Sequence, residues 1–212
     1  MFNIIAPEET LQYCREVITK NSLAQRGKAD GSKAEQAIGL LGQTVICDAF
    51  SIERIKGDEG FDGGYDLVIA GKKVDVKTIG RTVDPKPEYV NNIMGLQKNY
   101  SVDAYIFCSY NKKARNRITV CGMISKERFF QEATHFRQGD KRKRSDGSAM
   151  TVKEGLYEIK NSALDQADSM DDLMDLFDKR IAKYSKVLLE YMTMSPGHNQ
   201  IPKIKEQIRG LK

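Results

Sequence analysis

Apolar and polar residues alternate with a strand-like period in the middle of the chain and with a helical period near both ends. Glycine, proline and serine residues separate these runs and set the expected boundaries. The glycine-rich stretch 57–64 is expected to be a loop, and 80–97 to begin as one. The pattern predicts helices at 7–20, 32–42, 125–133 and 169–192, and strands at 44–52, 67–70, 74–76, 102–109, 117–124 and 156–159, the last at a sheet edge.

The clearest strand pattern lies at 65–78, with the sequence YDLVIAGKKVDVKT. Two apolar, β-branched runs flank a glycine and two lysines, which is typical of a tight antiparallel hairpin. With Gly71 and Lys72 as the two turn residues, Asp66 pairs with Lys77.

Three charged side chains of the hairpin are expected on one face. Because side chains alternate along a strand, Asp66, Asp75 and Lys77 point the same way. An ordinary buried face rarely carries such residues, since unpaired buried charge is costly. The structural alternative is a cross-strand ion pair of Asp66 with Lys77, worth about 0.2–1 kcal/mol when exposed, with Asp75 facing solvent.

A further acidic residue, Glu35, lies in the first turn of the helix expected at 32–42. Ser32 and Glu35 have the spacing of a capping box, in which the glutamate satisfies the backbone N–H of the N-cap residue. The other interpretation is that this helix packs across the strand ends and brings Glu35 to the acidic face. Spacing leaves both interpretations open.

The composition is that of one domain with a real core and a helical appendage. The chain has 212 residues, of which 40% are hydrophobic, and we expect a core at 1–165 and a C-terminal helical extension at 166–212. The long helix at 169–192 has an apolar stripe typical of a packing helix, and it is a candidate interface for a homodimer. A net charge of +5 permits a polyanionic partner without requiring one.

The cysteines and the hydropathy favour a cytoplasmic protein. Cys14, Cys47, Cys108 and Cys121 lie among apolar neighbours without the spacing of a zinc or redox motif, so buried, reduced thiols are expected. No apolar run approaches the roughly 18 residues that a membrane span needs, and no leader sequence opens the chain. We therefore expect no membrane association.

The chemistry open to the acidic face is hydrolysis of a phosphodiester. Such hydrolysis needs an activated water and a stabilised anionic transition state, and Mg²⁺ provides both. Magnesium prefers oxygen ligands and typically takes one or two carboxylates, here Asp66 and Asp75, with the main-chain carbonyl of Val76 as a further oxygen. Lys77 would hold the attacking water or stabilise the developing charge, and Mn²⁺ is a possible substitute for Mg²⁺.

The order of these features resembles the PD-(D/E)xK nuclease superfamily. In that superfamily a helical glutamate precedes an aspartate and an (Asp/Glu)-x-Lys motif on paired strands of a mixed sheet. The helix sequence GSKAEQAIGLLG at 31–42 is similar to the first helix of the Holliday-junction-resolvase and restriction-endonuclease-like branches. The strand DAYIFCS at 103–109 stands where that fold has its fourth core strand. The resemblance covers about 25–135, with Tyr65 where the name-giving motif has proline.

The resemblance implies an α/β fold with a restriction-endonuclease-like mixed sheet flanked by helices. It also implies a magnesium-dependent DNA endonuclease that leaves a 5′-phosphate. Asp66 and Asp75 then become metal ligands, Lys77 the catalytic lysine and Glu35 the helical acid. The alternatives are a non-catalytic nucleic-acid-binding protein on the same fold and an α/β interaction module unrelated to nucleases.

Basic residues in loops and turns are candidate contacts to DNA phosphates. The run KRKR at 141–144 is the most compact of them, although most such runs are solvated turns. The candidates are Arg81, Lys86, Lys112, Lys113, Arg115, Lys141, Arg142, Lys143 and Arg144.

Overall fold

The computed structural model of the chain describes residues 1–20, 32–54, 64–143 and 147–177. All of them belong to the first of two compact units, 1–177 and 178–212, into which the chain divides. Its elements are, in chain order, β1 (Phe2–Ile5), α1 (Glu8–Lys20), α2 (Lys33–Ala49), β2 (Leu67–Ile69), β3 (Lys72–Arg81), β4 (Val90–Met94), the 3-10 helix η2 (Gly95–Asn99), β5 (Ala104–Asn111), β6 (Arg117–Ser125), α3 (Lys126–Glu132), β7 (Thr134–Phe136), β8 (Lys141–Lys143), β9 (Ala149–Thr151), β10 (Leu156–Lys160), the 3-10 helix η3 (Asn161–Ala163) and α4 (Met170–Phe177).

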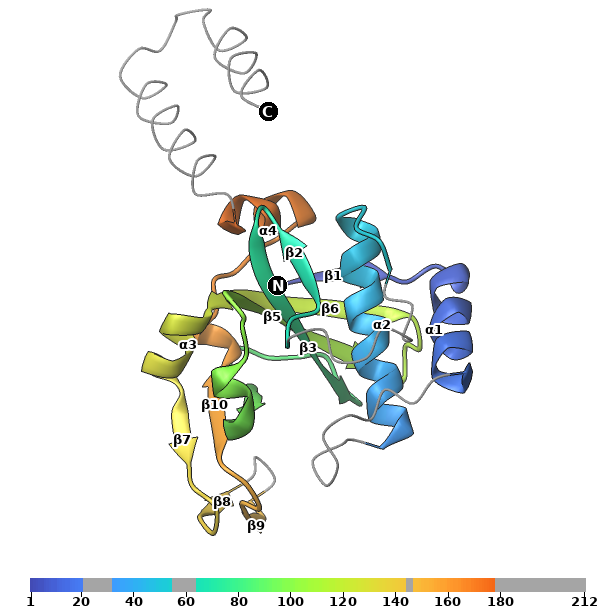
Figure 1. The fold of residues 1–212 in the computed structure, drawn as a ribbon. Coiled ribbons are helices and arrows are strands. Elements are labelled where there is room, and N and C mark those ends of the chain that lie inside the picture. Colours follow the sequence, from blue (N-terminus) through green and yellow to red (C-terminus); the bar gives the residue numbers. More distant parts are fainter. Residues whose placement is uncertain (21–31, 55–63, 144–146, 178–212) are drawn as a thin grey trace, which may run out of the picture. The chain divides into compact units, whose positions relative to one another are not determined.

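A mixed sheet forms the centre of this unit (Figure 1). Within the described residues it has five strands in the order β1-β6-β5-β3-β2. β3 and β5 are parallel, and the other neighbours are antiparallel. The smaller sheets β4-β10-β7 and β8-β9 complete the described strands. The expected α/β class is therefore confirmed, as are the helices expected at 7–20 and 125–133.

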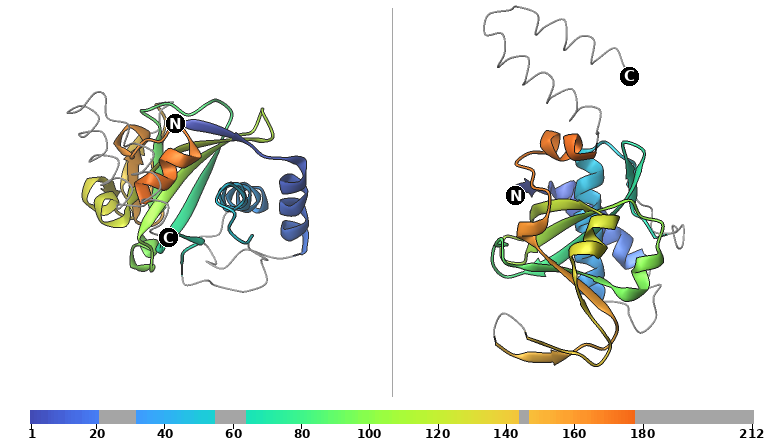
Figure 2. Two further views of the ribbon diagram at one scale, coloured as in Figure 1. Left: turned by 90° about the horizontal axis from the view of Figure 1, so that it is seen from above. Right: turned by 90° about the vertical axis from the view of Figure 1, so that its left-hand side faces the viewer.

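Apolar side chains fill both faces of the central sheet. On one face α1 and α2 pack beside each other (Figure 2, left), and the core there includes Val74 and Val76 of β3. Residues that alternate with these along the strands point to the opposite face. There Tyr105 and Phe107 of β5 pack with Phe129 of α3, and the ring centroids of Tyr105 and Phe129 lie 5.4 Å apart. The sheet thus separates two apolar layers.

Helix α2 is longer than the sequence pattern predicts. It begins as expected, with Ser32 as its N-cap, but it continues to Ala49, so the strand expected at 44–52 is wrong. The residues from Thr44 to Cys47 are all buried, because this part of the helix lies between the sheet and α1. A short run that is apolar all round fits a buried helix as well as a buried strand.

Gly42, the predicted end of this helix, lies in its interior for a packing reason. A Cβ atom at Gly42 would overlap the Thr78 side chain of β3, and its nearest atom would be Oγ1. The glycine therefore permits close contact between helix and strand, and it does not end the helix.

Replacing Gly42 by alanine is expected to lower the free energy of unfolding by about 1–3 kcal/mol, the usual cost of overpacking a core. The matched control is Gly39→Ala in the same helix, where a Cβ atom would meet nothing within 4 Å. That change is expected to be neutral or to stabilise the protein by up to about 1 kcal/mol, because alanine favours helices. Urea denaturation followed by circular dichroism measures both, and equal stability of the two variants would contradict the assigned packing.

In the segment expected to begin as a loop, 80–97, residues 82–89 are a loop between two strands, as the sequence predicts. β3 extends to Arg81, and Val90–Met94 forms β4. β10 pairs with β4 on one side and β7 on the other, so its expected place at a sheet edge is wrong. The polar sequence of β4 is accommodated because the buried Asn91 amide donates to Asn161 Oδ1 at 2.7 Å.

β7, β10 and the β8–β9 hairpin form an arm that leads away from the five-stranded sheet (Figure 2, right). The basic residues Lys141–Lys143, expected in a loop, form β8. Arg142 Nε donates to Glu158 of β10 at 2.6 Å, and the Glu158 side chain is only 8% exposed. This ion pair connects the tip of the arm to its base.

The first unit also includes α4, which lies beyond the predicted boundary at 165. Leu173 and Phe177 of α4 are buried in the same core as α2. The rest of the helix expected at 169–192 lies outside the described residues, as does most of the loop expected at 57–64.

The described part of the chain contains no helix that is both long and apolar enough to cross a membrane. The four cysteines lie within it and are buried and free, as the sequence predicts.

Candidate active site on the β2–β3 hairpin

The predicted antiparallel hairpin is present, with a turn one residue from the predicted position. Leu67 of β2 pairs with Val74 of β3. The turn residues are Ala70 and Gly71, whose φ angles are 48° and 75°. Two positive φ angles are what a type I′ turn requires. The predicted turn at Gly71 and Lys72 is therefore wrong.

This shift changes the cross-strand partner of Asp66 but not its face. Moving the turn by one residue moves the pairing by two, so the observed register places Asp66 opposite Asp75 and not opposite Lys77. Because the side-chain period of a strand is two, Asp66, Asp75 and Lys77 still share a face. The Asp66 N–H donates to the carbonyl of Val74 at 2.9 Å and extends the strand pairing.

Asp75 is the member of this group that contacts both of the others. Lys77 Nζ lies 2.7 Å from Asp75 Oδ2, with the lysine side chain 23% exposed and the aspartate 4%. The Asp66 carboxyl accepts the Val76 N–H at 2.7 Å and is also hydrogen-bonded to the carboxyl of Asp75. The ion pair of the site is thus Asp75 with Lys77, and Asp66 contacts Asp75 instead of pairing across the hairpin with Lys77.

The electrostatics of the site are dominated by two adjacent carboxyl groups. Burial first, and the negative charge of Asp75 second, raise the pKa of Asp66 well above its ordinary value. The charge of Lys77 and the Val76 N–H act in the opposite direction but do not reverse the shift. One ammonium group is too little positive charge for the buried carboxylate of Asp75 and the partly buried one of Asp66, so the site favours either a proton on Asp66 or an additional cation.

Tyr105 lies on the same side of the sheet as these carboxylates, and sequence reasoning missed it. It is the parallel neighbour of Asp75, and its ring is fully buried. Its hydroxyl has no hydrogen-bond partner among the described residues. Burial, and then the charge of Asp75, raise the pKa of the phenol. The signal in the sequence was weak, because a tyrosine in the apolar run 102–109 is typical of a core strand.

Gln43 is the second residue that the sequence reasoning missed. It is buried on α2, and its Nε2 lies 3.5 Å from the main-chain oxygen of Asp66. The contact could be found from sequence only by extending the helix through Gly42. The α2 side chain that contacts Asp66 is therefore Gln43, which lies about two helical turns beyond Glu35.

Glu35 occupies a capping box. Its Oε2 accepts the Ser32 N–H at 2.7 Å and the Ser32 hydroxyl at 2.8 Å, while the Ser32 side chain accepts the Glu35 N–H. These hydrogen bonds lower the pKa of Glu35. Glu35 is exposed, and the positive charge of Lys112 also lowers its pKa. The structure does not bring Glu35 into contact with Asp66 or Asp75.

The predicted DNA contacts are dispersed over the described unit. Arg81 points to the same face as Lys77, but its Nη2 donates to the Val90 carbonyl at 2.8 Å and its guanidinium stacks on Tyr89. Burial lowers the pKa of Arg81. Arg142 is paired with Glu158. Arg144 lies outside the described residues, and the exposed candidates are Lys86, Lys112, Lys113, Arg115, Lys141 and Lys143.

The donor set suits a magnesium ion in number and chemistry. No group of three or more His, Cys, Asp or Glu side chains gathers anywhere in the described ranges. Magnesium, however, needs only one or two carboxylates and keeps several waters. Asp66 and Asp75 meet that requirement, and the backbone of Val76 already contacts Asp66 through its N–H. The adjacent carboxyl groups fit a divalent cation because it would offset their mutual repulsion.

Comparison with models of known families, with curated proteins and with solved structures gives no match for this chain.

Proposed function

We propose that this protein is a magnesium-dependent deoxyribonuclease of the PD-(D/E)xK type with a restriction-endonuclease-like core, and that it acts as an endonuclease. The observation that carries the proposal is that Asp75 contacts both Asp66 and Lys77 on one face of paired strands. A structural ion pair needs only Asp75 and Lys77. The second carboxyl, which is partly buried beside the first, adds repulsion that a purely structural site has no reason to keep.

The architecture supports the same proposal. β3 pairs with β2 of the hairpin on one edge and with the parallel strand β5 on the other. Helix α2 packs on one face of β3. The carboxylates lie on the other face, beside the half-buried Lys77. A substrate phosphate can reach that lysine and the partly exposed Asp66 from solvent, while Asp75 stays buried.

The roles of the residues follow from their contacts. Asp66 and Asp75 would hold Mg²⁺, with the Val76 carbonyl as a further oxygen. When bound, the ion lowers the pKa of a water molecule and offsets charge on the phosphate. Lys77 donates hydrogen bonds to the attacking water or to a phosphate oxygen. The water gives up a proton to solvent and its oxygen would bond to phosphorus as the bond to the 3′-oxygen breaks. The 3′-oxygen takes up a proton, so that the product strands end in a 3′-hydroxyl and a 5′-phosphate.

A second candidate is a non-catalytic DNA-binding protein on the same fold. The observation in its favour is that Glu35, the predicted helical acid, binds its own N-cap. The exposed basic residues are consistent with both candidate functions, because both require contacts to DNA phosphates.

Cleavage assays on three DNA forms distinguish the two candidates. The purified protein is expected to nick or degrade duplex, single-stranded or branched DNA with Mg²⁺ or Mn²⁺, and to stop when a chelator is added. End-labelling should find 5′-phosphates on the products. Binding without cleavage of any form, with either ion, would reject the nuclease and leave the second candidate.

A further inference from the structure

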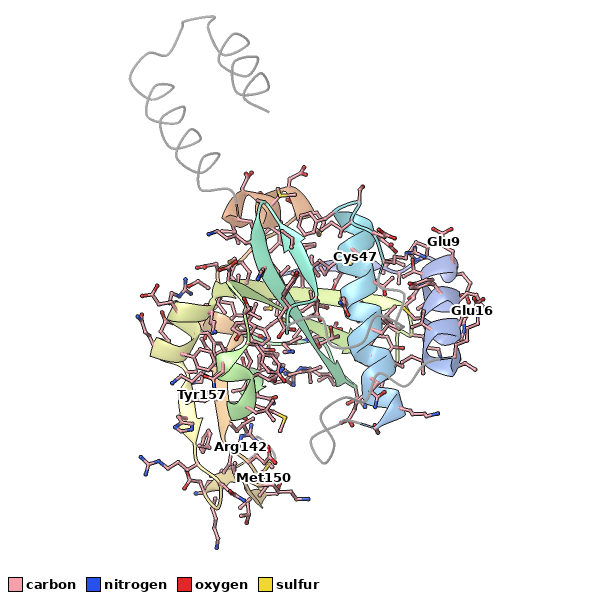
Figure 3. The ribbon with its side chains drawn as sticks, viewed as in Figure 1. Glu9, Glu16, Cys47, Arg142, Met150 and Tyr157 are labelled. Carbon is pink, nitrogen blue, oxygen red and sulfur yellow. The ribbon has the colours of Figure 1, made fainter. Side chains whose placement is uncertain are left out.

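A cluster of rings and one lysine lies where the arm leaves the central sheet, and the cleavage chemistry does not use it. We call Lys98, Phe130, His135 and Tyr157 the ring cluster. His135 and Tyr157 are direct partners of the β7–β10 pair, and their rings stack with centroids 4.3 Å apart and an interplanar angle of 10°. Phe130 meets Tyr157 edge-on at 4.9 Å. Figure 3 shows Tyr157 at the base of the arm, with Arg142 and Met150 near its tip.

The ring cluster is open to solvent and carries positive charge. His135 and Lys98 are exposed, and Tyr157 and Phe130 are partly buried. Lys98 Nζ lies 5.6 Å from the Phe130 centroid and 5.7 Å from that of Tyr157. The carboxylate of Glu158 does not oppose this charge, because it alternates with Tyr157 onto the other face and is paired with Arg142.

The ring cluster belongs to the same apolar layer as the candidate site. Tyr157, Phe130 and Tyr65 all pack as partly buried residues on the layer that contains Tyr105. Tyr65 directly precedes Asp66, and Lys73 Nζ lies 5.0 Å from its ring centroid. Rings accompanied by lysines therefore occur both beside the carboxylates and at the base of the arm.

We infer that the ring cluster binds an unpaired base of a DNA strand that passes to the Asp66–Asp75 site, an inference that rests on the proposed function. An exposed ring already stacked on a second ring is a rigid platform for a base, and Lys98 supplies charge for the neighbouring phosphate. A base inside a duplex has both faces covered by its neighbours and cannot stack on His135. The substrate class is therefore DNA with a single-stranded segment.

Fluorescence anisotropy with the full chain tests this inference in the presence of a chelator, so that no strand is cut. The probes are a labelled 12-nucleotide thymidine strand and a blunt duplex of the same length. His135→Ala is expected to weaken single-strand binding about tenfold and duplex binding less than twofold. His135→Phe keeps a ring and is expected to bind like the unmodified protein. Lys20→Ala, an exposed lysine on α1, controls for general loss of positive charge.

Two outcomes would overturn the inference: equal single-strand binding by His135→Ala and the unmodified protein, or an equal loss on both probes. A loss of affinity in His135→Phe as large as that in His135→Ala would also overturn it, because the ring would then not matter. The proposed function is tested separately by cleavage with Mg²⁺. A protein that binds through His135 but never cleaves rejects the nuclease alone, and one that cleaves without needing His135 rejects this inference alone.

Discussion

Replacing Asp75 by asparagine is expected to reduce DNA cleavage by about 10³-fold or more, the order of effect seen when a group that stabilises transition-state charge is lost. Asp75 is at once a proposed metal ligand and the ion-pair partner of Lys77 at 2.7 Å. Its loss removes a ligand charge and leaves the ammonium without a fixed orientation. Lys77→Ala is expected to have a similar effect on the turnover number. Initial rates on the DNA form that is cut best give both values.

The matched control for these variants is Lys72→Ala, which removes an exposed lysine from the same strand. Cleavage by this variant is expected to stay within about threefold of the unmodified protein, because loss of one exposed charge is a small effect. Circular dichroism and thermal unfolding must show that all three variants are folded. If folded Asp75→Asn or Lys77→Ala protein cuts DNA as fast as Lys72→Ala, the proposed catalytic role of the hairpin is contradicted.

Replacing Asp66 by asparagine is expected to make the protein more stable at neutral pH while it abolishes cleavage. The raised pKa of Asp66 means that the fold prefers the protonated carboxyl. Its contribution to stability is fully present below the pKa of the unfolded chain, and it is lost as pH rises through the folded pKa. Asparagine keeps the shape without the charge. The gain at high pH is expected to be about 1–3 kcal/mol, the cost of a poorly compensated buried polar group.

Urea denaturation at several pH values measures this gain. The stability of Asp66→Asn minus that of the unmodified protein is expected to be near zero at about pH 4, close to the ordinary aspartate pKa, and to grow as pH rises. Glu35→Gln is the control of opposite sign, because the pKa of Glu35 is lowered by its hydrogen bonds to Ser32. The stability that Glu35 contributes is present above its unfolded pKa and is lost as pH falls through the folded pKa. A difference for Asp66→Asn that is independent of pH would contradict the assigned electrostatics.

The acidic face was predictable from sequence because it depends only on the alternation of side chains along a strand, which has a period of two residues. The predicted turn was wrong by one residue, yet a two-residue change of register returns every side chain to the same face. The ion-pair partner of Lys77 was not predictable in this way. The predicted register placed Asp66 opposite Lys77, whereas the observed partner is Asp75 of the same strand.

Features that depend on contacts distant in sequence could not be predicted. Gly42 is a glycine because of Thr78, a residue on another element. The role of Arg142 depends on Glu158 in the same manner. Local spacing, in contrast, indicated the capping box of Glu35 as one of two interpretations, because all of its partners lie within one helical turn, and the structure contains that capping box.

The ring cluster could not be predicted from the sequence either. Lys98, Phe130, His135 and Tyr157 lie in four different elements, and no periodicity relates them. They come together because β10 pairs with β7 and β4, α3 packs against β10, and η2 packs against β4. Sequence motifs describe such surfaces poorly, even where the individual residues are common ligands of nucleic acids.

The most direct test of the central claim, that Asp66 and Asp75 together hold a divalent cation, is a calorimetric titration of Mn²⁺ into the full-length protein and into Asp66→Asn. The unmodified protein is expected to bind Mn²⁺ with a saturable heat. Asp66→Asn keeps the ion pair of Asp75 with Lys77 and is expected to show no saturable binding. Equal binding by both proteins, or no binding by the unmodified protein, would contradict the claim.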